Sequence, residues 1–207
     1  SYYNQISGEI PLSLTTLPNL VSFYADDNKL SGNIPDGIWS MPSLKYLGLR
    51  GNRLTGSISS AIANAKGLEQ LWLGNNHLTG PIPDDICEMT NLKELSLGNG
   101  NRSMAIGRYP AYQYNVFNGS IPNNINKLTN LESLSLKTCG LSGTIPNTLY
   151  TMSNLKEFNV GNASGAGGPE LTSQIITYFN HISGVIPSDV VGLINLERFG
   201  IAGNEIT

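Results

Sequence analysis

The sequence predicts a solenoid of the α/β class, in which short repeats stack side by side and each supplies one strand and one short turn of helix. The tetrad Gly-x-Ile-Pro recurs along the 207-residue chain, and most of its copies lie 24 residues apart. Within each period, apolar residues first alternate with a spacing of two and then recur with a spacing of three to four. Such a period indicates a repeat architecture, because one unit cannot bury its apolar stripe without neighbours.

The tetrad sets the register of the repeats. The copy at Gly56 carries Ser59 in place of proline, and two of the steps between copies are 39 and 41 residues rather than 24. The copies begin at Gly8, Gly32, Gly56, Gly80, Gly119, Gly143 and Gly184. We therefore expect one solenoid segment over residues 1–207, with about seven repeats and with loop insertions near residues 98–112 and 161–177.

An inner strand is expected where the period-two pattern lies. Leu47 and Leu49 alternate with other residues in one repeat, and Leu71 and Leu73 do so in the next. Successive side chains of a strand point to opposite faces, so these leucines should face the core and their neighbours solvent. The following Leu-x-Gly is expected to be loop. The Ile-Pro-x-x-Ile-x-x-Leu spacing suits a short 3-10 or helical turn on the opposite side.

A column of asparagines follows the strands. The turn after each strand leaves backbone N–H and C=O groups that cannot reach water and must be paired. An asparagine amide can pair both kinds of group, because it donates and accepts. One period carries cysteine at this position, which we expect to be a buried, reduced, structural thiol. The predicted internal ladder consists of Asn28, Asn52, Asn76, Asn115, Cys139, Asn180 and Asn204.

The two cysteines of the chain are Cys87 and Cys139. Cys87 lies on the helical side of a coil two periods from Cys139. At about 4.8 Å per stacked strand, the two would be roughly 10 Å apart. A disulfide needs Cα atoms within about 7 Å. We therefore expect no disulfide, and two cysteines alone cannot form a zinc site.

The composition excludes several classes of function. The net charge of −3 and the pI of about 5.3 give no basic footprint for nucleic acid. The chain has no apolar run of roughly 18 residues, so we expect no membrane segment within it. His77 and His181 occupy a turn position without partners at metal-ligand spacing. The sequence therefore predicts no metal site and no cofactor.

Catalysis is not expected either. Glu94 and Glu157 occupy the same inner-strand column two strands apart, which places them near 10 Å from each other. A glycosidase needs its carboxyl groups roughly 5–9.5 Å apart across a cleft. An open concave face also does not exclude water. We therefore predict no catalytic residues and a protein that is not an enzyme.

The 24-residue unit L-x-x-L-x-L-x-x-N-x-L-x-G-x-I-P has near-complete copies at residues 44–67 and 68–91. It resembles the plant-specific class of leucine-rich repeats, found in ectodomains of plant receptor kinases, in receptor-like proteins and in polygalacturonase-inhibiting proteins. The resemblance implies a curved, right-handed superhelix with a parallel inner sheet, and a protein that binds partners outside the cell. The cysteine-paired caps of such ectodomains are not found, so we expect the segment to be part of a longer chain.

The concave sheet is the usual binding face of this class. Three aromatic residues fall at exposed positions of three adjacent strands, and charged residues follow them. Aromatic side chains beside charges supply a large contact area at small entropic cost, as a peptide or carbohydrate site requires. Scattered surface aromatics are also normal, and that reading stays open. The candidate ligand-binding residues are Tyr24, Asp26, Asp27, Tyr46, Arg50 and Trp72.

Both insertions fall between an inner strand and the next ladder asparagine, so they should leave the solenoid at the same edge. They are either tolerated loops or a lip on the concave face, and we favour the lip because both occupy the same site. Sequons occur at Asn101, Asn118 and Asn162. Asn101 and Asn162 fall in the insertions, where exposed loops would let glycans attach to a secreted chain.

These features favour an extracellular or cell-surface recognition module. Its partner would be a peptide, a glycan or a protein, bound through the concave sheet and the inserted loops. Two alternatives remain. One is a structural or filament-forming protein whose uncapped ends make end-to-end contacts. The other is an inhibitor of a secreted polysaccharide-degrading enzyme.

Overall fold

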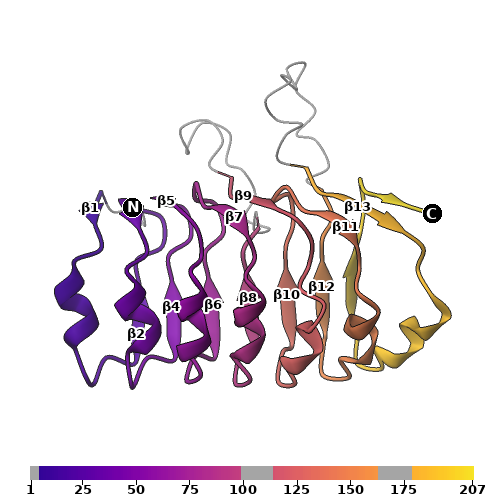
Figure 1. Ribbon diagram of the computed structural model, residues 1–207, viewed down its shortest axis with the longest axis horizontal. Coiled ribbons are helices and arrows are strands. Elements are labelled where there is room, and N and C mark those ends of the chain that lie inside the picture. The colour runs from indigo at the N-terminus through magenta and orange to yellow at the C-terminus, as the bar shows by residue number, and fades with distance from the viewer. Residues whose placement is uncertain (1–4, 99–113, 163–178) are drawn as a thin grey trace, which may run out of the picture.

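The computed structural model describes residues 5–98, 114–162 and 179–207, and these form a stack of parallel coils (Figure 1). One strand from each coil joins a parallel inner sheet in the order β14-β12-β10-β8-β6-β4-β2. Its strands are β2 (Ser22–Tyr24), β4 (Tyr46–Gly48), β6 (Gln70–Trp72), β8 (Glu94–Ser96), β10 (Ser133–Ser135), β12 (Glu157–Asn159) and β14 (Arg198–Gly200). The expected α/β solenoid with a parallel inner sheet is confirmed.

A short 3-10 turn lies in each coil between one inner strand and the next, as expected. Proline precedes five of the seven turns. Its fixed φ and missing N–H suit the entry to a helical turn, where the N–H has no intrahelical acceptor. The turns are η1 (Leu12–Thr16), η2 (Asp36–Ser40), η3 (Ser60–Asn64), η4 (Asp84–Glu88), η5 (Ile125–Lys127), η6 (Asn147–Thr151) and η7 (Ser188–Gly192). None of the described helices combines the length and apolarity needed to cross a membrane.

A second set of strands occupies the Leu-x-Gly segments, where loop was expected. Their strands pair in parallel with the neighbouring coils. Hydroxyl groups strengthen this pairing, because Ser142, Ser183 and Thr207 each donate to a glycine carbonyl of the preceding coil at 3.3 Å. These outer strands are β1 (Ser7–Glu9), β3 (Lys29–Asn33), β5 (Arg53–Thr55), β7 (Thr79–Pro81), β9 (Val116–Asn118), β11 (Ser142–Thr144), β13 (His181–Gly184) and β15 (Glu205–Ile206).

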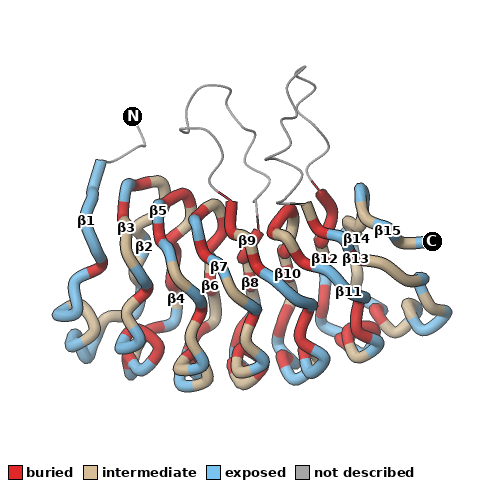
Figure 2. The backbone as a smooth tube through the Cα atoms, turned by 45° about the horizontal axis from the view of Figure 1, so that its top comes forward, coloured by how far each residue is buried: buried red, intermediate tan, exposed pale blue. Residues whose placement is uncertain are grey.

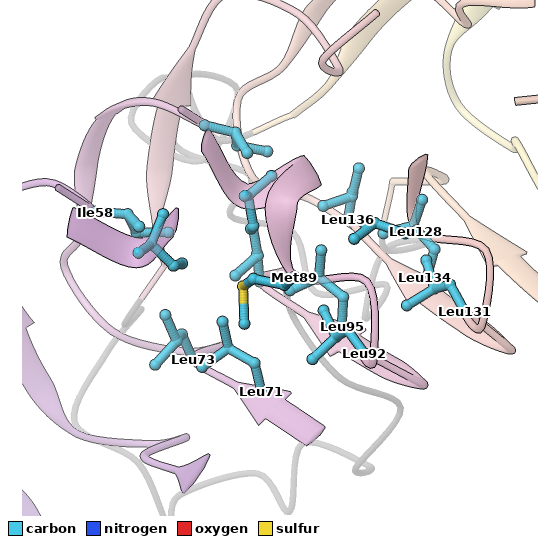
Figure 3. Close-up of a cluster of buried hydrophobic side chains, with 14 of the residues drawn as sticks. Ile58, Leu71, Leu73, Met89, Leu92, Leu95, Leu128, Leu131, Leu134 and Leu136 are labelled. Carbon is cyan, nitrogen blue, oxygen red and sulfur yellow. The ribbon is translucent and has the colours of Figure 1, made fainter. Parts of the chain in front are cut away.

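The core is one cluster of apolar side chains that runs through the stack (Figure 2). Leu47, Leu49, Leu71 and Leu73 are completely buried, as their spacing predicted. Figure 3 shows the inner leucines of several coils beside Met89, which follows η4. Because each coil buries its apolar side chains against the next coil, the inner sheet is a rigid platform for the side chains on its open face.

The ladder asparagines join neighbouring coils. Asn76 Nδ2 donates to the carbonyls of Leu49 and Leu73 at 2.9 Å, and Asn76 Oδ1 accepts from the Leu54 N–H at 3.0 Å. The same pattern holds at Asn52 and at Asn204. Each amide therefore satisfies backbone groups of its own coil and of the preceding one.

Cys139 replaces the amide by two other contacts. Its Sγ donates to the Leu136 carbonyl at 3.0 Å, and its own carbonyl accepts from the Phe117 N–H at 2.8 Å. The following Gly140 has a φ of 81°, in the left-handed region, and a Cβ there would meet the Phe117 oxygen at 2.9 Å. Gly140 thus allows the Cys139 backbone carbonyl to accept the hydrogen bond that an asparagine Oδ1 accepts in other coils. Cys139 and Cys87 are both buried and free, as expected.

Asn162 corrects an expectation. Its side chain is buried, and its Nδ2 donates to the carbonyls of Asn180 and Gly203. Its Oδ1 accepts from the Asn180 N–H at 2.7 Å. Asn162 therefore acts as an additional ladder residue, and the nitrogen that a glycan would need is already engaged. Asn118 is exposed on β9, and Asn101 lies outside the described residues.

Candidate functional site

An aromatic pair lies on the open face of the inner sheet. Tyr24 ends β2 and Trp72 ends β6, and their ring centroids are 5.8 Å apart with the planes inclined by 36°. The strand between them carries Gly48 in the same row. A Cβ at Gly48 would lie 2.6 Å from Tyr24 Cδ1. The missing side chain therefore lets the two rings meet across the intervening strand.

Arg50 completes the pair from the next row. Its Cζ lies 4.3 Å from the centroid of the Trp72 ring, which is a cation–π contact. Asp26 Oδ1 accepts from the Arg50 backbone N–H at 2.8 Å and from Arg50 Nε at 3.4 Å. The guanidinium is thereby held over the indole ring. Tyr24, Asp26, Arg50 and Trp72 form one group, which we call the aromatic–arginine cluster.

A hydrogen-bond network fixes the far side of the cluster. Trp72 Nε1 donates to Glu94 Oε2 at 3.2 Å, and Gln70 Nε2 donates to Glu94 Oε1 at 2.9 Å. The Tyr24 hydroxyl donates to Gln70 Oε1 at 3.2 Å. Burial raises the pKa of Tyr24, and the nearby groups Tyr46, Asp26 and Glu94 add to this. The phenol therefore stays protonated and keeps its donor role at neutral pH.

Gln70 and Glu94 were not among the six candidate residues, although both lie at exposed positions of predicted strands. The signal that can find them is the strand register, which places Gln70 directly opposite Glu94 and places Trp72 diagonally from Glu94 on the adjacent strand. Two of the six candidates lie apart from the cluster. Asp27 takes the left-handed turn position before a ladder asparagine, with a φ of 58°. Tyr46 lines an adjoining shallow hollow of about 320 Å³, which Gln70 and Glu94 also line.

A row of charges that alternate in sign begins beside this hollow at Lys45 and continues along its lining. Lys45 and Lys93 both contact Glu69, at 3.1 and 2.8 Å, and Lys156 contacts Glu132 at 2.7 Å. Hydrogen bonds from Lys93 and then Lys45 lower the pKa of Glu69. The sequence shows this pattern as Lys and Glu alternating at the residue before each inner strand from β4 to β14. Five carboxylates and three cations line the hollow, so its lining carries a net negative charge.

The described residues contain no group of three or more His, Cys, Asp and Glu side chains that could hold a metal ion. Glu94 and Glu157 are separated by β10 and have different partners. Glu94 holds Gln70 and Trp72, whereas Glu157 accepts from Arg198 at 2.9 Å. Among these residues, the face is equipped for recognition by rings, a guanidinium and amides.

Family models agree with this architecture. A model described as leucine rich repeat matches residues 42–102, and a second of the same description matches residues 19–41 and 130–152. Together they cover slightly more than half of the chain. The chain belongs to the leucine-rich repeat family. A search of curated protein sequences found no match to this leucine-rich repeat chain.

Solved structures of plant proteins have the same fold. A TDR receptor has a TM-score of 0.79 at 24% identity, over 100% of this chain and 30% of its own. The Arabidopsis receptor kinase HAESA, solved with the peptide hormone IDA and the co-receptor SERK1, has a TM-score of 0.66 at 26% identity, over 99% and 33%. A plant ice-binding protein has a TM-score of 0.70 at 24% identity, over 98% and 54%. The leucine-rich repeat chain thus spans about a third of the two receptors.

The insertions of this leucine-rich repeat protein, predicted near residues 98–112 and 161–177, lie almost wholly outside the described residues. Their anchoring points are described. One follows β8 and ends before Asn115, and the other follows β12 and ends before Asn180. Both anchors belong to the asparagine ladder and are buried. The leucine-rich repeat frame is therefore continuous on both sides of each insertion.

Proposed function

We propose that this leucine-rich repeat protein is an extracellular recognition module that binds a peptide along its concave sheet. The observation that carries the proposal is the aromatic–arginine cluster. Its rings and guanidinium are fixed by mutual contacts before any ligand arrives, so little side-chain entropy is lost on binding. Aromatic and arginine side chains are also the residue types that dominate binding energy at protein interfaces.

The surface beside the cluster suits an extended chain. The row that contains Tyr24 and Trp72 continues across later strands with the small or short side chains of Ser96, Ser135 and Asn159. A peptide anchored at the cluster would find a shallow, polar track there, with serine and asparagine groups for its backbone. The HAESA structure, with its peptide hormone, supports a peptide as the class of ligand.

The proposed role is binding without chemical conversion of the ligand. Three described carboxylates of the open face are engaged in hydrogen bonds and ion pairs, namely Glu69, Glu94 and Glu157. The face is open, so it would not exclude water from a reacting group. Recognition of a peptide needs neither feature.

A selection from a random peptide library tests the proposal. The 207-residue chain is immobilised, and enriched peptides are then measured against a variant with Tyr24→Ser and Trp72→Ser. We expect peptides whose affinity falls about tenfold or more in this variant, because such side chains act as anchors. A matched variant with Asn64→Ser and Asn147→Ser, on the 3-10 turns, should bind as the wild type does. Absence of enriched peptides, or equal losses in both variants, would refute the proposal.

The structural alternative has one observation in its favour. Apart from Tyr24, the exposed large apolar side chains of the described residues lie in the first and last coils. Contacts between such ends would build a linear assembly of this leucine-rich repeat protein. Long assemblies at micromolar concentration, together with failure of the peptide selection, would favour this alternative.

A further inference from the structure

We propose that the charged row at the start of the inner strands is a contact surface between two copies of this chain, paired around a two-fold axis. The row consists of the residues that directly precede the inner strands β4 to β14. Its members are Lys45, Glu69, Lys93, Glu132, Lys156 and Glu197. This pairing goes beyond the proposed peptide binding and does not depend on it.

The row is continuous across six coils. The N–H of each member after Lys45 donates to the carbonyl of the member before it, and every one of these bonds is 2.8 Å long. Neighbouring members therefore lie one strand spacing apart, roughly 4.8 Å. The side chains of Lys45, Lys93 and Lys156 are about half exposed, so their amines are accessible to a second molecule.

Contacts within the chain do not balance the row. Lys45 and Lys93 share Glu69, and Lys156 pairs with Glu132, which leaves Glu197 without an ion pair among the described residues. The first three members are two lysines and one glutamate, so that half carries one excess positive charge. The last three are two glutamates and one lysine, so the other half carries one excess negative charge.

A two-fold axis makes the row complementary to itself, because the same surface then meets itself in reverse order. The row begins with lysine, ends with glutamate and alternates throughout, so its reverse places an opposite charge at every position. Lys45 would face Glu197 of the second copy, Glu69 would face Lys156, and Lys93 would face Glu132. A shift by one coil would bring like charges together, which specifies a single register.

The other charges of the hollow do not oppose this pairing. Outside the row, the lining carries the carboxylates of Glu94 and Glu157 and the guanidinium of Arg198. Glu157 pairs with Arg198 at 2.9 Å. Because the row itself is neutral, the excess negative charge is that of Glu94, whose two oxygens already accept hydrogen bonds from Gln70 and Trp72.

The pairing should be weak and sensitive to salt, because exposed ion pairs are individually weak and are screened by ions. We expect a reversible dimer at about 0.02 M salt, with a dissociation constant on the order of 100 µM, and binding about tenfold weaker or more at about 0.15 M salt. Association through the apolar ends differs on both counts, because salt does not screen apolar contacts and end-to-end stacking does not stop at two copies. Sedimentation velocity of the 207-residue chain at both salt concentrations measures this.

Charge reversals test the register. Glu69→Lys and Lys156→Glu each introduce two like-charge contacts into the dimer, so each variant alone should remain monomeric at low salt. Mixed one to one, the two variants should form a mixed dimer, because every position again faces an opposite charge. The matched control mixes Glu69→Lys with Lys45→Glu, which has the same change of charge as Lys156→Glu but leaves two like-charge contacts. Circular dichroism checks that each variant is folded.

The proposal fails if the wild type is monomeric at low salt, if Glu69→Lys still dimerises, or if the control mixture associates as strongly as the test mixture. The last result would indicate general attraction between opposite charges. Assemblies larger than a dimer that persist at the higher salt concentration would indicate contacts between apolar ends instead. Failure of the peptide selection would refute the proposed function and leave this pairing intact, whereas peptides that bind a strictly monomeric chain would do the reverse.

Discussion

At the residue scale, Asn76 illustrates how the coils are held together. Its amide group contacts the carbonyls of Leu49 and Leu73 and the N–H of Leu54, and the side chain has no exposure to solvent. Without it, the Leu54 N–H would be buried with no partner, whereas the carbonyls of Leu49 and Leu73 would each keep one donor, Asn52 Nδ2 and Asn115 Nδ2. The cost of such an orphaned group exceeds the net gain of an average hydrogen bond.

We therefore expect Asn76→Ala to lower the free energy of unfolding by about 1–3 kcal/mol, the usual cost of one orphaned buried group. The measurement is urea denaturation followed by circular dichroism. Asn64→Ala is the matched control, because Asn64 is exposed at the end of η3 and should change stability by about 0.5 kcal/mol or less. Similar losses in the two variants would show that the ladder is not what joins the coils.

The thiols give a prediction about pH. Burial raises the pKa of Cys87 to about 11, and burial also raises the pKa of Cys139. The thiolate is the reactive form, so neither residue should react with iodoacetamide in the folded protein at pH 8. Both should be alkylated in denaturant, and Cys87 should become reactive first as the pH rises toward its pKa. Mass spectrometry of the alkylated protein measures this, and rapid labelling of Cys139 at pH 8 would contradict the buried position.

The sequence predicted the ladder residues because they recur at a fixed place in the period. It did not predict the role of Asn162. A ladder asparagine such as Asn52 stands three residues after the last inward strand residue, whereas Asn162 stands two after Val160. Only the three-dimensional closure of that coil brings its amide to the backbone of Asn180. The sequon suggested that the Asn162 side chain is exposed, but its amide is buried.

At the element scale, the inner strand β4 acts through a missing side chain. Gly48 separates Tyr24 from Trp72 in the row, and its lack of a Cβ allows the rings to approach within 5.8 Å. Any added atom would meet Tyr24 Cδ1 at 2.6 Å and Asp26 Oδ2 at 2.7 Å. Two members of the cluster would thus be displaced together.

We expect Gly48→Ala to separate the two rings and weaken peptide binding, while the protein stays folded. The stability lost should be of the order of 1 kcal/mol, the usual value of an aromatic pair. Near-ultraviolet circular dichroism reports the ring pair, and titration with a selected peptide reports affinity. Gly67→Ala is the control, because a Cβ there would make an ordinary 3.4 Å contact with the Leu44 oxygen. An unchanged spectrum and affinity in Gly48→Ala would contradict this role.

The inner strands were predictable and the outer strands were not, for a physical reason. An inner strand such as β6 shows the period-two alternation of a sheet with one buried face. The outer strand β3 contains Gly32 at a φ of 75°, a conformation that disrupts such a pattern. The strand forms because stacking of the coils places its backbone beside the equivalent backbone of the adjacent coil. This pairing depends on the stack as a whole, so the local sequence gives little indication of it.

At the scale of the whole molecule, the described residues are mostly buried in the middle coils and more exposed in the outermost coils (Figure 2). The inner leucines of the middle coils are almost completely buried, whereas similar side chains in the outermost coils are uncovered. The exposed apolar side chains at the ends are Ile6, Leu12, Leu17, Val21, Val185, Ile186, Val191 and Ile194. A stack of equivalent repeats has this property because each coil covers its neighbour and the outermost coils are covered on one side only.

The last prediction concerns self-association of the 207-residue chain. Because both ends carry exposed apolar groups and open strand edges, we expect head-to-tail association that increases with concentration. Sedimentation velocity measures it. A variant with Val191→Glu and Ile194→Lys should stay monomeric, because association would then bury two charges against an apolar end. The same charges at Asn64 and Asn147, on middle coils, should leave association unchanged. If the wild type is monomeric across the micromolar range, the ends do not attract each other, and the case for a filament-forming role disappears while that for the concave site is unaffected.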